Sequence, residues 1–158
     1  MNLLSRNDLV ELYKEVGFDT IPIDFGKKYP PPKDWKTKDS SELWSDAPKD
    51  SNIALRLGRY GDLDSDSSKT DEFIENMLKE LGIDNVPTFY ARRGKHRIVI
   101  IEDAPEIVKI RHWKKEIGKG EVRVKDNYTV IPDSTVNGYK YAWIGNSYEF
   151  LRNVPRLN

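Results

Sequence analysis

The sequence predicts a single α+β domain over residues 1–158, and three observations lead to this fold class. Two stretches, near residues 7–16 and 67–81, carry apolar residues at helical spacing. Between and after them lie short runs rich in β-branched and aromatic residues, each bounded by glycine, proline or aspartate. The length of 158 residues suits one domain with a sizeable core, and the chain has no repeats, low-complexity tails or obvious linker. We therefore expect about six to eight strands and about two to four helices.

The composition excludes several classes of protein. The 26 basic and 26 acidic side chains give a formal net charge of zero, so only a local basic patch could bind nucleic acid. The chain has no cysteine, which excludes disulfides and thiolate zinc sites. No apolar run approaches the ~20 residues of a membrane span, and the N-terminus lacks the features of a signal peptide. We expect a soluble cytoplasmic protein with no membrane partner and no zinc.

The first helix is predicted to begin at a cap provided by Ser5 or Asn7 and to end at Gly17. A short strand over residues 18–23 follows. Residues 26–36 then form a stiff, proline-rich loop that contains four lysines and two aromatic residues. Lysines beside aromatic rings suit a nucleotide or single-stranded DNA, although the tryptophan could simply fill the core. The candidates for contact with a DNA template are Lys27, Lys28, Lys33 and Trp35.

A stretch of alternating aspartates follows a short helix predicted near residues 40–44. Residues 52–57 have the pattern of a buried strand, and Asp62, Asp64 and Asp66 then occupy alternate positions. In an extended chain, these three side chains point the same way, while the intervening leucine faces the core. Carboxylates that lie so close repel one another unless a cation holds them, and Mg²⁺ accepts such oxygens. The alternative is a solvated loop that starts the next helix.

That next helix is predicted over residues 67–81 from its clear apolar stripe, which indicates core packing. Residues 88–91 and 96–101 then form a hairpin whose tip, residues 92–95, holds three basic residues and a glycine. His96 follows the tip directly. Free backbone N–H groups and basic side chains are what a phosphate-binding turn needs. The alternative is a solvated hairpin tip, where lysine and arginine are common.

The last third of the chain is predicted to be mostly strands. Residues 105–113 suit a strand or a helix equally, and residues 121–125 alternate strictly between polar and apolar. A turn leads to a returning strand over 128–131, and a final strand covers 139–144. The two valines of the alternating segment face the core, whereas Glu121, Arg123 and Lys125 share the opposite face. Taken alone, that charged face is best interpreted as solvent-exposed sheet.

In this order, the segments resemble the primase-polymerase (prim-pol) domain of the archaeo-eukaryotic primase superfamily, in the form found on plasmids and viruses. The resemblance covers nearly the whole chain. Each motif is weak alone, but five motifs in the correct order are a strong signal. They are Gly17-Phe18 to Ile23 with Gly26-Lys27-Lys28-Tyr29-Pro30-Pro31 and Trp35-Lys36; Trp44 with Asn52 to Gly58; Asp62-Leu63-Asp64-Ser65; Gly94-Lys95-His96; and Glu121 to Val124 with Tyr128 to Ser134, Gly138 and Tyr141-Ala142-Trp143.

The resemblance implies an archaeo-eukaryotic primase-like catalytic fold, with mixed or antiparallel sheets flanked by helices and one half similar to an RNA-recognition motif. It implies a nucleotidyltransferase, a DNA primase or DNA-directed polymerase, that makes or extends primers from dNTPs or NTPs on single-stranded DNA during plasmid or viral replication. The implied cofactors are two Mg²⁺ or Mn²⁺ ions that arrive with the nucleotide. A separate helicase or accessory domain is the implied partner.

The resemblance also implies roles for individual residues. The expected catalytic residues and metal ligands are Asp62, Asp64 and Glu121. The expected nucleotide-binding residues are His96, Arg93, Lys95, Arg97, Arg123 and Ser134.

The chain departs from the family pattern at several positions. The strand before the aspartates is short, which leaves the register open, so that Asp64 and Asp66 could form the metal pair instead. Glu121 stands where aspartate is usual, Arg93 where a glycine is common, and Asp133 where a second proline is common. None of these departures removes a type of metal ligand, so activity is still expected. Two other functions remain open: a module that binds DNA or nucleotide without chemistry in replication initiation, and a metal-dependent phosphohydrolase.

Overall fold

The computed structural model describes residues 4–102 and 110–157. Its strands are β1 (Thr20–Ile23), β2 (Asn52–Arg56), β3 (Tyr60–Ser65), β4 (Thr88–Tyr90), β5 (Lys95–Ile100), β6 (Ile110–His112), β7 (Gly120–Arg123), β8 (Tyr128–Ile131), β9 (Thr135–Val136), β10 (Tyr139–Lys140) and β11 (Ala142–Trp143). Its helices are α1 (Arg6–Glu15), α2 (Ser40–Ser45), α3 (Ser68–Glu80), α4 (Ser147–Phe150) and the short 3₁₀ helix η1 (Leu151–Asn153).

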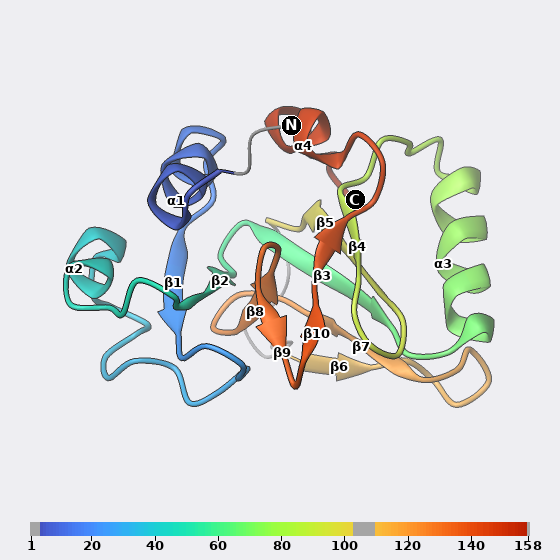
Figure 1. Ribbon diagram of the computed structural model, residues 1–158. Helices are drawn as coiled ribbons and strands as arrows, with labels where there is room; N and C mark the ends of the chain where they lie inside the picture. The colour runs from blue at the N-terminus through green and yellow to red at the C-terminus, as the bar shows by residue number, and fades with distance from the viewer. Residues whose placement is uncertain (1–3, 103–109, 158) are drawn as a thin grey trace.

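The strands form three sheets, and all of their pairings are antiparallel (Figure 1). The largest sheet has the order β11-β4-β5-β3-β7-β6, the second β1-β2-β8, and the third is the hairpin β10-β9. The predicted α+β class is confirmed. The described residues contain more strands than expected, because the last third of the chain is divided into several short strands that serve different sheets.

The two longest helices begin where the local sequence predicts. Ser5 caps α1 by accepting a hydrogen bond from the Asp8 N–H at 3.1 Å, and Ser67 caps α3 by accepting one from the Thr70 N–H at 3.3 Å. A glycine follows each helix, and Gly82 takes a left-handed φ of 69° that favours glycine.

Helix α3 covers one face of the six-stranded sheet, as Figure 1 shows at the right. Its residues Ile74 and Leu78 pack against Leu63 of β3 and Val99 of β5, and all four side chains are at most 5% exposed. Burial of each such side chain stabilises the fold by about 1.5–3 kcal/mol. The apolar stripe of α3 is therefore core packing, as predicted.

The other face of the six-stranded sheet is buried against the second sheet. Ile98 of β5 belongs to the same buried cluster as Ile53 of β2 and Ile131 of β8, and Tyr13 of α1 closes this cluster. Helices α1 and α2 lie beside β1 on the outer side of the second sheet (Figure 1). Polar side chains on this inner face of β3 and β5 must consequently find partners inside the protein.

Two predicted connections are wrong, because consecutive strands join different sheets. Strand β7 pairs with β3 and β6, whereas β8 pairs with β2, so residues 121–131 do not form a hairpin. Between them Asp126 takes a left-handed φ of 66° where the chain changes sheets. Residues 139–144 likewise form two strands on either side of Tyr141, since β10 pairs with β9 and β11 with β4. Of the ambiguous segment 105–113, residues 110–112 form β6, and residues 103–109 lie outside the described residues.

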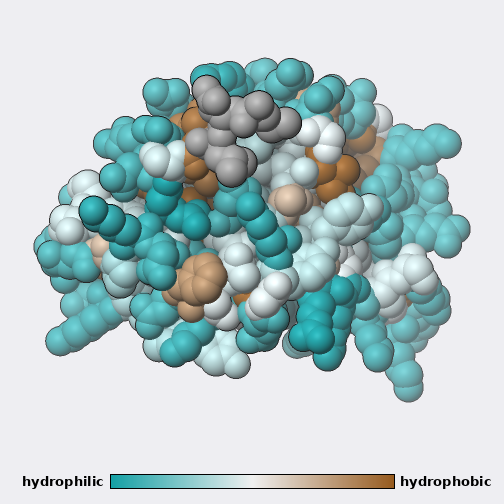
Figure 2. All heavy atoms as spheres, in the orientation of Figure 1, coloured by the Kyte–Doolittle hydropathy of each residue, from teal (hydrophilic) through white to brown (hydrophobic). Residues whose placement is uncertain are grey.

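The face drawn in Figure 2 is largely hydrophilic, with hydrophobic residues showing only in small separate areas. Within residues 4–102 and 110–157, no helix has both the length and the apolar character that a membrane crossing requires.

Candidate active site

Strand pairing places the predicted charged residues of three strands on one face of the large sheet. In β3, Asp64 lies opposite His96 of β5 and Glu121 of β7, and Asp62 lies opposite Arg123 of β7. Directly opposed residues of an antiparallel pair extend to the same side of the sheet. Glu121 and Arg123 therefore lie on the same face as the aspartates and are only partly exposed, so the interpretation of their face as solvent-exposed sheet is wrong for these two residues.

Asp62 is fully buried and has two hydrogen-bond donors on one carboxylate oxygen. His96 Nδ1 lies 2.7 Å from Asp62 Oδ2, and the Thr129 hydroxyl of β8 donates to the same oxygen at 2.8 Å. The other oxygen, Oδ1, is buried and has no hydrogen-bond partner in the part of the chain that the structure describes. Side chains from both sheets thus fix the orientation of Asp62, and its Oδ1 remains available to accept a further bond.

Asp64 is buried as well, and its Oδ1 also has no hydrogen-bond partner among the described residues. His96 Nε2 lies 3.5 Å from that oxygen, which is longer than a hydrogen bond. The pKa of Asp64 is raised to about 7: burial is the largest cause, the charges of Asp62 and Asp66 also raise it, and His96 and Arg123 act against them. Burial lowers the pKa of His96, but the charge and hydrogen bond of Asp62 outweigh it and leave that pKa above the usual value.

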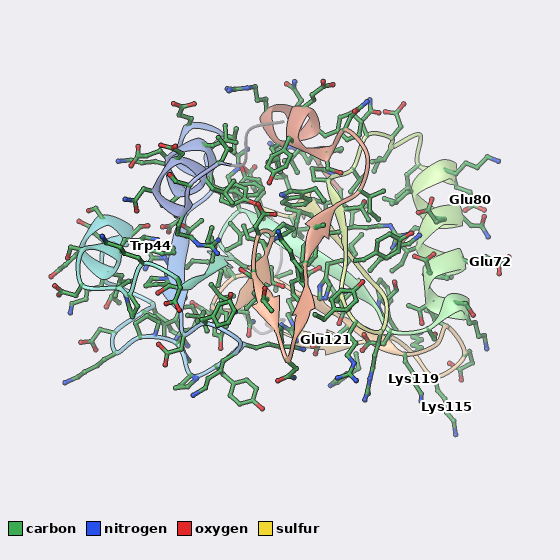
Figure 3. All side chains as sticks on the ribbon, viewed as in Figure 1. Trp44, Glu72, Glu80, Lys115, Lys119 and Glu121 are labelled. Atoms are coloured by element: carbon green, nitrogen blue, oxygen red, sulfur yellow. The ribbon has the colours of Figure 1, made fainter. Side chains whose placement is uncertain are left out.

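Glu121 is held by its neighbour on the same strand face. Arg123 Nε donates to Glu121 Oε1 at 2.9 Å, and its Nη2 contacts the same oxygen at 2.5 Å. Burial lowers the pKa of Arg123, but the bond to Glu121 and the two aspartates outweigh it and raise that pKa. In Figure 3, Glu121 lies on the sheet near the β9–β10 hairpin, whereas Glu72 and Glu80 extend outward from α3.

These side chains fit a divalent cation in part. Two buried carboxylate oxygens without donors are the ligands that Mg²⁺ or Mn²⁺ prefers, and they lie on one strand face. Across residues 4–102 and 110–157, no three acidic or histidine side chains are gathered closely enough to hold a metal ion. Glu121 could become a third ligand only by giving up its contact with Arg123. While that contact holds, a cation at the two aspartates would need its further ligands from a nucleotide.

A cleft of about 600 Å³ opens above this face. Its acidic lining comes from Asp64, Asp66 and Glu121, and its basic lining includes Lys28, Arg92, Arg93 and Arg123. Lys28, Arg92 and Arg93 are exposed, so they form the rim, whereas Asp64 is buried at the floor. An acidic floor with a basic rim suits a ligand that carries both cations and phosphates.

The proline-rich loop, residues 26–36, forms one wall of the cleft and is hydrogen-bonded to side chains of β2. Asn52, fully buried, donates to the Lys27 carbonyl at 2.9 Å and to the Thr135 carbonyl at 2.7 Å. Arg56 Nη1 donates to the carbonyls of Trp35 and Lys38, both at 2.6 Å. The loop is therefore held near both ends by side chains of one strand.

Two predicted nucleotide-binding residues face away from the cleft. Lys95 and Arg97 alternate with His96 along β5, so their side chains extend toward α3. Arg97 is 1% exposed and bonds to Asp71 and Glu75 of that helix, and Lys95 Nζ bonds to Asp71 at 3.2 Å. The expectation that these two cations join His96 at one phosphate site is wrong, because three consecutive strand residues cannot share a face.

Because Arg97 faces α3 and Arg93 faces the cleft, replacing each of them should have a different effect. Arg97→Met should lower the free energy of unfolding by about 1.5–3 kcal/mol, the usual loss for hydrogen bonds to charged groups, and leave the nucleotide KM unchanged. Arg93→Met should raise the nucleotide KM and leave the free energy of unfolding unchanged, because Arg93 is exposed and lines the cleft. Urea unfolding and steady-state kinetics on both variants test this. A raised KM with unchanged stability for Arg97→Met would contradict the placement.

Other expected site residues also have structural roles. Ser134 is fully buried and accepts a hydrogen bond from the Ile53 N–H at 2.8 Å, so the prediction that it binds nucleotide at the cleft is not supported. Trp35 lines the cleft, but it is half-buried, with its ring edge-on to Tyr128 at 5.2 Å. Lys27 and Lys33 are exposed and are not among the described residues that line the cleft.

Asp62 and Asp66 are the two candidates for the second aspartate of the metal pair, and each has one structural feature in its favour. Asp62 belongs to the bonded network of His96 and Thr129 but is fully buried, and it is not among the described cleft-lining residues. Asp66 follows β3, is exposed, and lines the cleft beside Asp64. Asp64 belongs to both candidate pairs.

The sequence interpretation did not include several residues that shape this site. Thr129 is a buried hydroxyl next to two apolar residues of β8, a pattern that indicates a buried partner. Trp113 donates its indole N–H to the Asp64 carbonyl at 2.7 Å. Gly94 and Gly120 leave room for the β3 backbone, since a Cβ built on them would lie 1.7 Å from the Ser65 carbonyl oxygen and 2.1 Å from that of Asp64.

The raised pKa values predict how stability depends on pH. Asp64, with a pKa of about 7, and His96 both bind protons more tightly in the folded than in the unfolded protein. The stabilisation that this gives is present at low pH and is lost as pH rises through the folded values. Metal-free protein should therefore unfold at lower urea concentration near pH 8 than near pH 6. The pKa of Asp71 is lowered, so the stability that its ionisation contributes is lost only at acid pH, below the range tested here.

Urea titrations with a chelator, across about pH 5 to 8, measure this dependence. Asp64→Asn should flatten the curve and be more stable than the wild type near pH 8, because its amide carries no charge. A wild-type protein that gains stability across this range would contradict the prediction.

Comparison with known proteins gives a family for this chain. No curated protein matches it. A family model described as "Bifunctional DNA primase/polymerase, N-terminal" (Prim-Pol) matches residues 10–157, nearly the whole chain. The predicted resemblance is thereby confirmed, and the matched residues include all five motifs that suggested it, together with the cleft and the aspartate face described above. This family implies DNA primase or polymerase activity in general, and the chain belongs to the Prim-Pol family.

Proposed function

We propose that this protein is a template-directed nucleotidyltransferase that makes or extends primers on single-stranded DNA. The observation that carries the proposal is the shared face of β3, β5 and β7, where Asp62, Asp64, His96, Glu121 and Arg123 meet. The cleft above this face has room for a nucleotide and has a basic rim. The resemblance to plasmid and viral members supports a role in their replication, with a separate helicase as partner.

The proposed reaction joins a primer 3′-hydroxyl to a nucleoside triphosphate. The hydroxyl oxygen loses its proton to water and attacks the α-phosphorus, the bond between that phosphorus and the oxygen bridging to the β-phosphate breaks, and pyrophosphate leaves. Divalent cations, when bound, would favour the deprotonated hydroxyl and neutralise the leaving group. Asp64, with Asp62 or Asp66, would hold them, and Glu121 would join after exchanging its contact with Arg123.

The remaining residues have roles that follow from their positions. His96 is oriented by Asp62 through Nδ1, which leaves Nε2, 3.5 Å from Asp64, as the nitrogen that can meet a phosphate oxygen. Arg123, once released by Glu121, can contact phosphate or sugar from the same face. Arg93 on the rim is placed for the outer phosphates.

The experiment that tests the proposal supplies labelled dNTPs or NTPs, with Mg²⁺ or Mn²⁺, on single-stranded DNA with and without a primer. Template-dependent extension supports it, and primer-free synthesis would add priming. Hydrolysis of nucleotide without synthesis would favour a phosphohydrolase instead.

A second candidate function is a module that binds DNA or nucleotide without chemistry. The contact of Glu121 with Arg123 favours it, as does the His96 ring between the two aspartates, because both contacts compensate the acidic charge without a metal. Metal-dependent nucleotide binding without extension under any of the conditions above would support this alternative.

A further inference from the structure

One large aromatic side chain stands out by its exposure and its position. Of the large apolar side chains described as exposed, Tyr29 has the highest exposed fraction, 71%, and it alone lines the catalytic cleft. Burial of aromatic surface is favourable, so a ring left in water at a ligand cleft is available for a ligand. Trp35 does not share this property, because Tyr128 and the core cover part of its ring.

The backbone that carries Tyr29 is held in place. The Tyr128 hydroxyl donates to the Lys28 carbonyl at 2.8 Å, and the buried Asn52 amide donates to the Lys27 carbonyl at 2.9 Å. Three prolines, residues 30–32, follow Tyr29 directly and fix their own φ angles. The ring is therefore presented from a pre-organised loop, and little conformational entropy is lost when a ligand stacks on it.

The surroundings of the ring favour a nucleic acid strand over a small apolar ligand. Lys28 stands beside Tyr29 on one wall, and Arg92 and Arg93 stand on the hairpin tip that lines the same cleft. All three are exposed cations. Basic side chains that follow a backbone, together with a ring that receives a base, are the usual elements of a single-strand binding groove.

We propose that Tyr29 is the stacking platform for a base of the template strand at the rim of the cleft. This inference rests on the proposed function, which supplies the template. The incoming nucleotide belongs at the floor, where Asp64 and Glu121 lie, whereas Tyr29 lies on the exposed wall. The contact is tolerant of sequence, because every base has a face that can stack.

Binding of a labelled single-stranded oligonucleotide, measured by fluorescence anisotropy over a range of salt concentrations without nucleotide, tests the proposal. Tyr29→Ala should raise Kd by about 5- to 150-fold, the usual loss for a base-stacking ring, and Tyr29→Phe should stay near the wild type. The salt dependence should be unchanged in both variants, since tyrosine carries no charge. Lys28→Ala should instead lower the salt slope by about one unit.

Phe25 provides the matched control. It lies four residues before Tyr29, is 54% exposed, and is not among the described residues that line the cleft. Phe25→Ala should therefore leave Kd unchanged. An unchanged Kd for Tyr29→Ala, or an equal loss for Phe25→Ala, would overturn the assignment.

A single abasic site, moved stepwise along the single-stranded overhang of a primer–template duplex whose junction fixes the register, identifies the stacked base. At one position the wild type should lose as much affinity as Tyr29→Ala loses on intact DNA, and the variant should lose nothing more there. Equal losses for both proteins at every position would exclude stacking. Primer extension by the wild type is measured in parallel, so that absence of extension counts against the proposed function and unchanged binding by Tyr29→Ala counts against this inference.

Discussion

Replacing Asp64 with asparagine is expected to reduce primer extension by about 10³-fold or more, because several kcal/mol of cation-mediated charge stabilisation depend on its carboxylate. Asp64 belongs to both candidate metal pairs, and its buried Oδ1 has no hydrogen-bond partner within residues 4–102 and 110–157. The fold should survive, since asparagine has nearly the same shape as aspartate. It also removes a buried carboxyl group whose pKa is raised to about 7, mainly by burial. Far-UV circular dichroism and urea unfolding check the fold beside the extension assay.

Two further variants identify the second aspartate of the pair. Asp62→Asn tests the residue bonded to His96 and Thr129, and Asp66→Asn tests the exposed residue at the cleft. Asp46→Asn, on an exposed residue just after α2, serves as the control and should leave extension unchanged. Full extension by Asp64→Asn would remove the aspartate face from the proposed chemistry.

Gly94→Ala is expected to be the most damaging single methyl addition to the described fold. A Cβ there would lie 1.7 Å from the Ser65 carbonyl oxygen and 2.8 Å from its carbon, so the backbone after Asp64 would have to move. Overpacking against rigid atoms costs about 1–3 kcal/mol or more, and the displaced strand carries the aspartates. We expect a loss of this size in urea unfolding, together with a loss of extension that remains under fully folded conditions.

Gly58→Ala is the matched control. A Cβ on Gly58 meets nothing within 4 Å, and its φ lies outside the left-handed region, so stability should change little. Equal stability of Gly94→Ala and wild type would show that the hairpin tip can move away from β3, against the close approach described here.

The sequence predicted the parts of the site that local periodicity determines. Alternation along β3 placed Asp62 and Asp64 on one face, and the same rule placed Glu121 and Arg123 together on β7. Caps and apolar stripes located α1 and α3. These features depend on residues within one element, so one sequence is enough to find them.

The features that were missed depend on contacts between distant segments. The turn at Asp126 suggested a hairpin, but β7 and β8 pair with strands far away in the chain, and turn chemistry does not reveal that choice. Arg97 is a separate case, because it follows His96 in the chain but alternation along β5 turns its side chain to the opposite face, toward α3. A hydroxyl in β8 indicates that Thr129 has some buried partner, but that this partner is Asp62 depends on the packing of the second sheet against the first, which no local pattern encodes.

The hydrogen bond from Trp113 to the Asp64 carbonyl has a spectroscopic consequence. Trp113 is one of four tryptophans, and its indole reports directly on the backbone of the aspartate that belongs to both candidate pairs. Its ring packs against Phe73 and the α3 core, on the side of the sheet away from the Asp64 carboxylate, so its emission would report a shift of the β3 backbone. With Trp35, Trp44 and Trp143 replaced by phenylalanine, the protein would contain one fluorophore directly behind the site, and movement of that backbone on ligand binding could be timed in a stopped-flow instrument without a label.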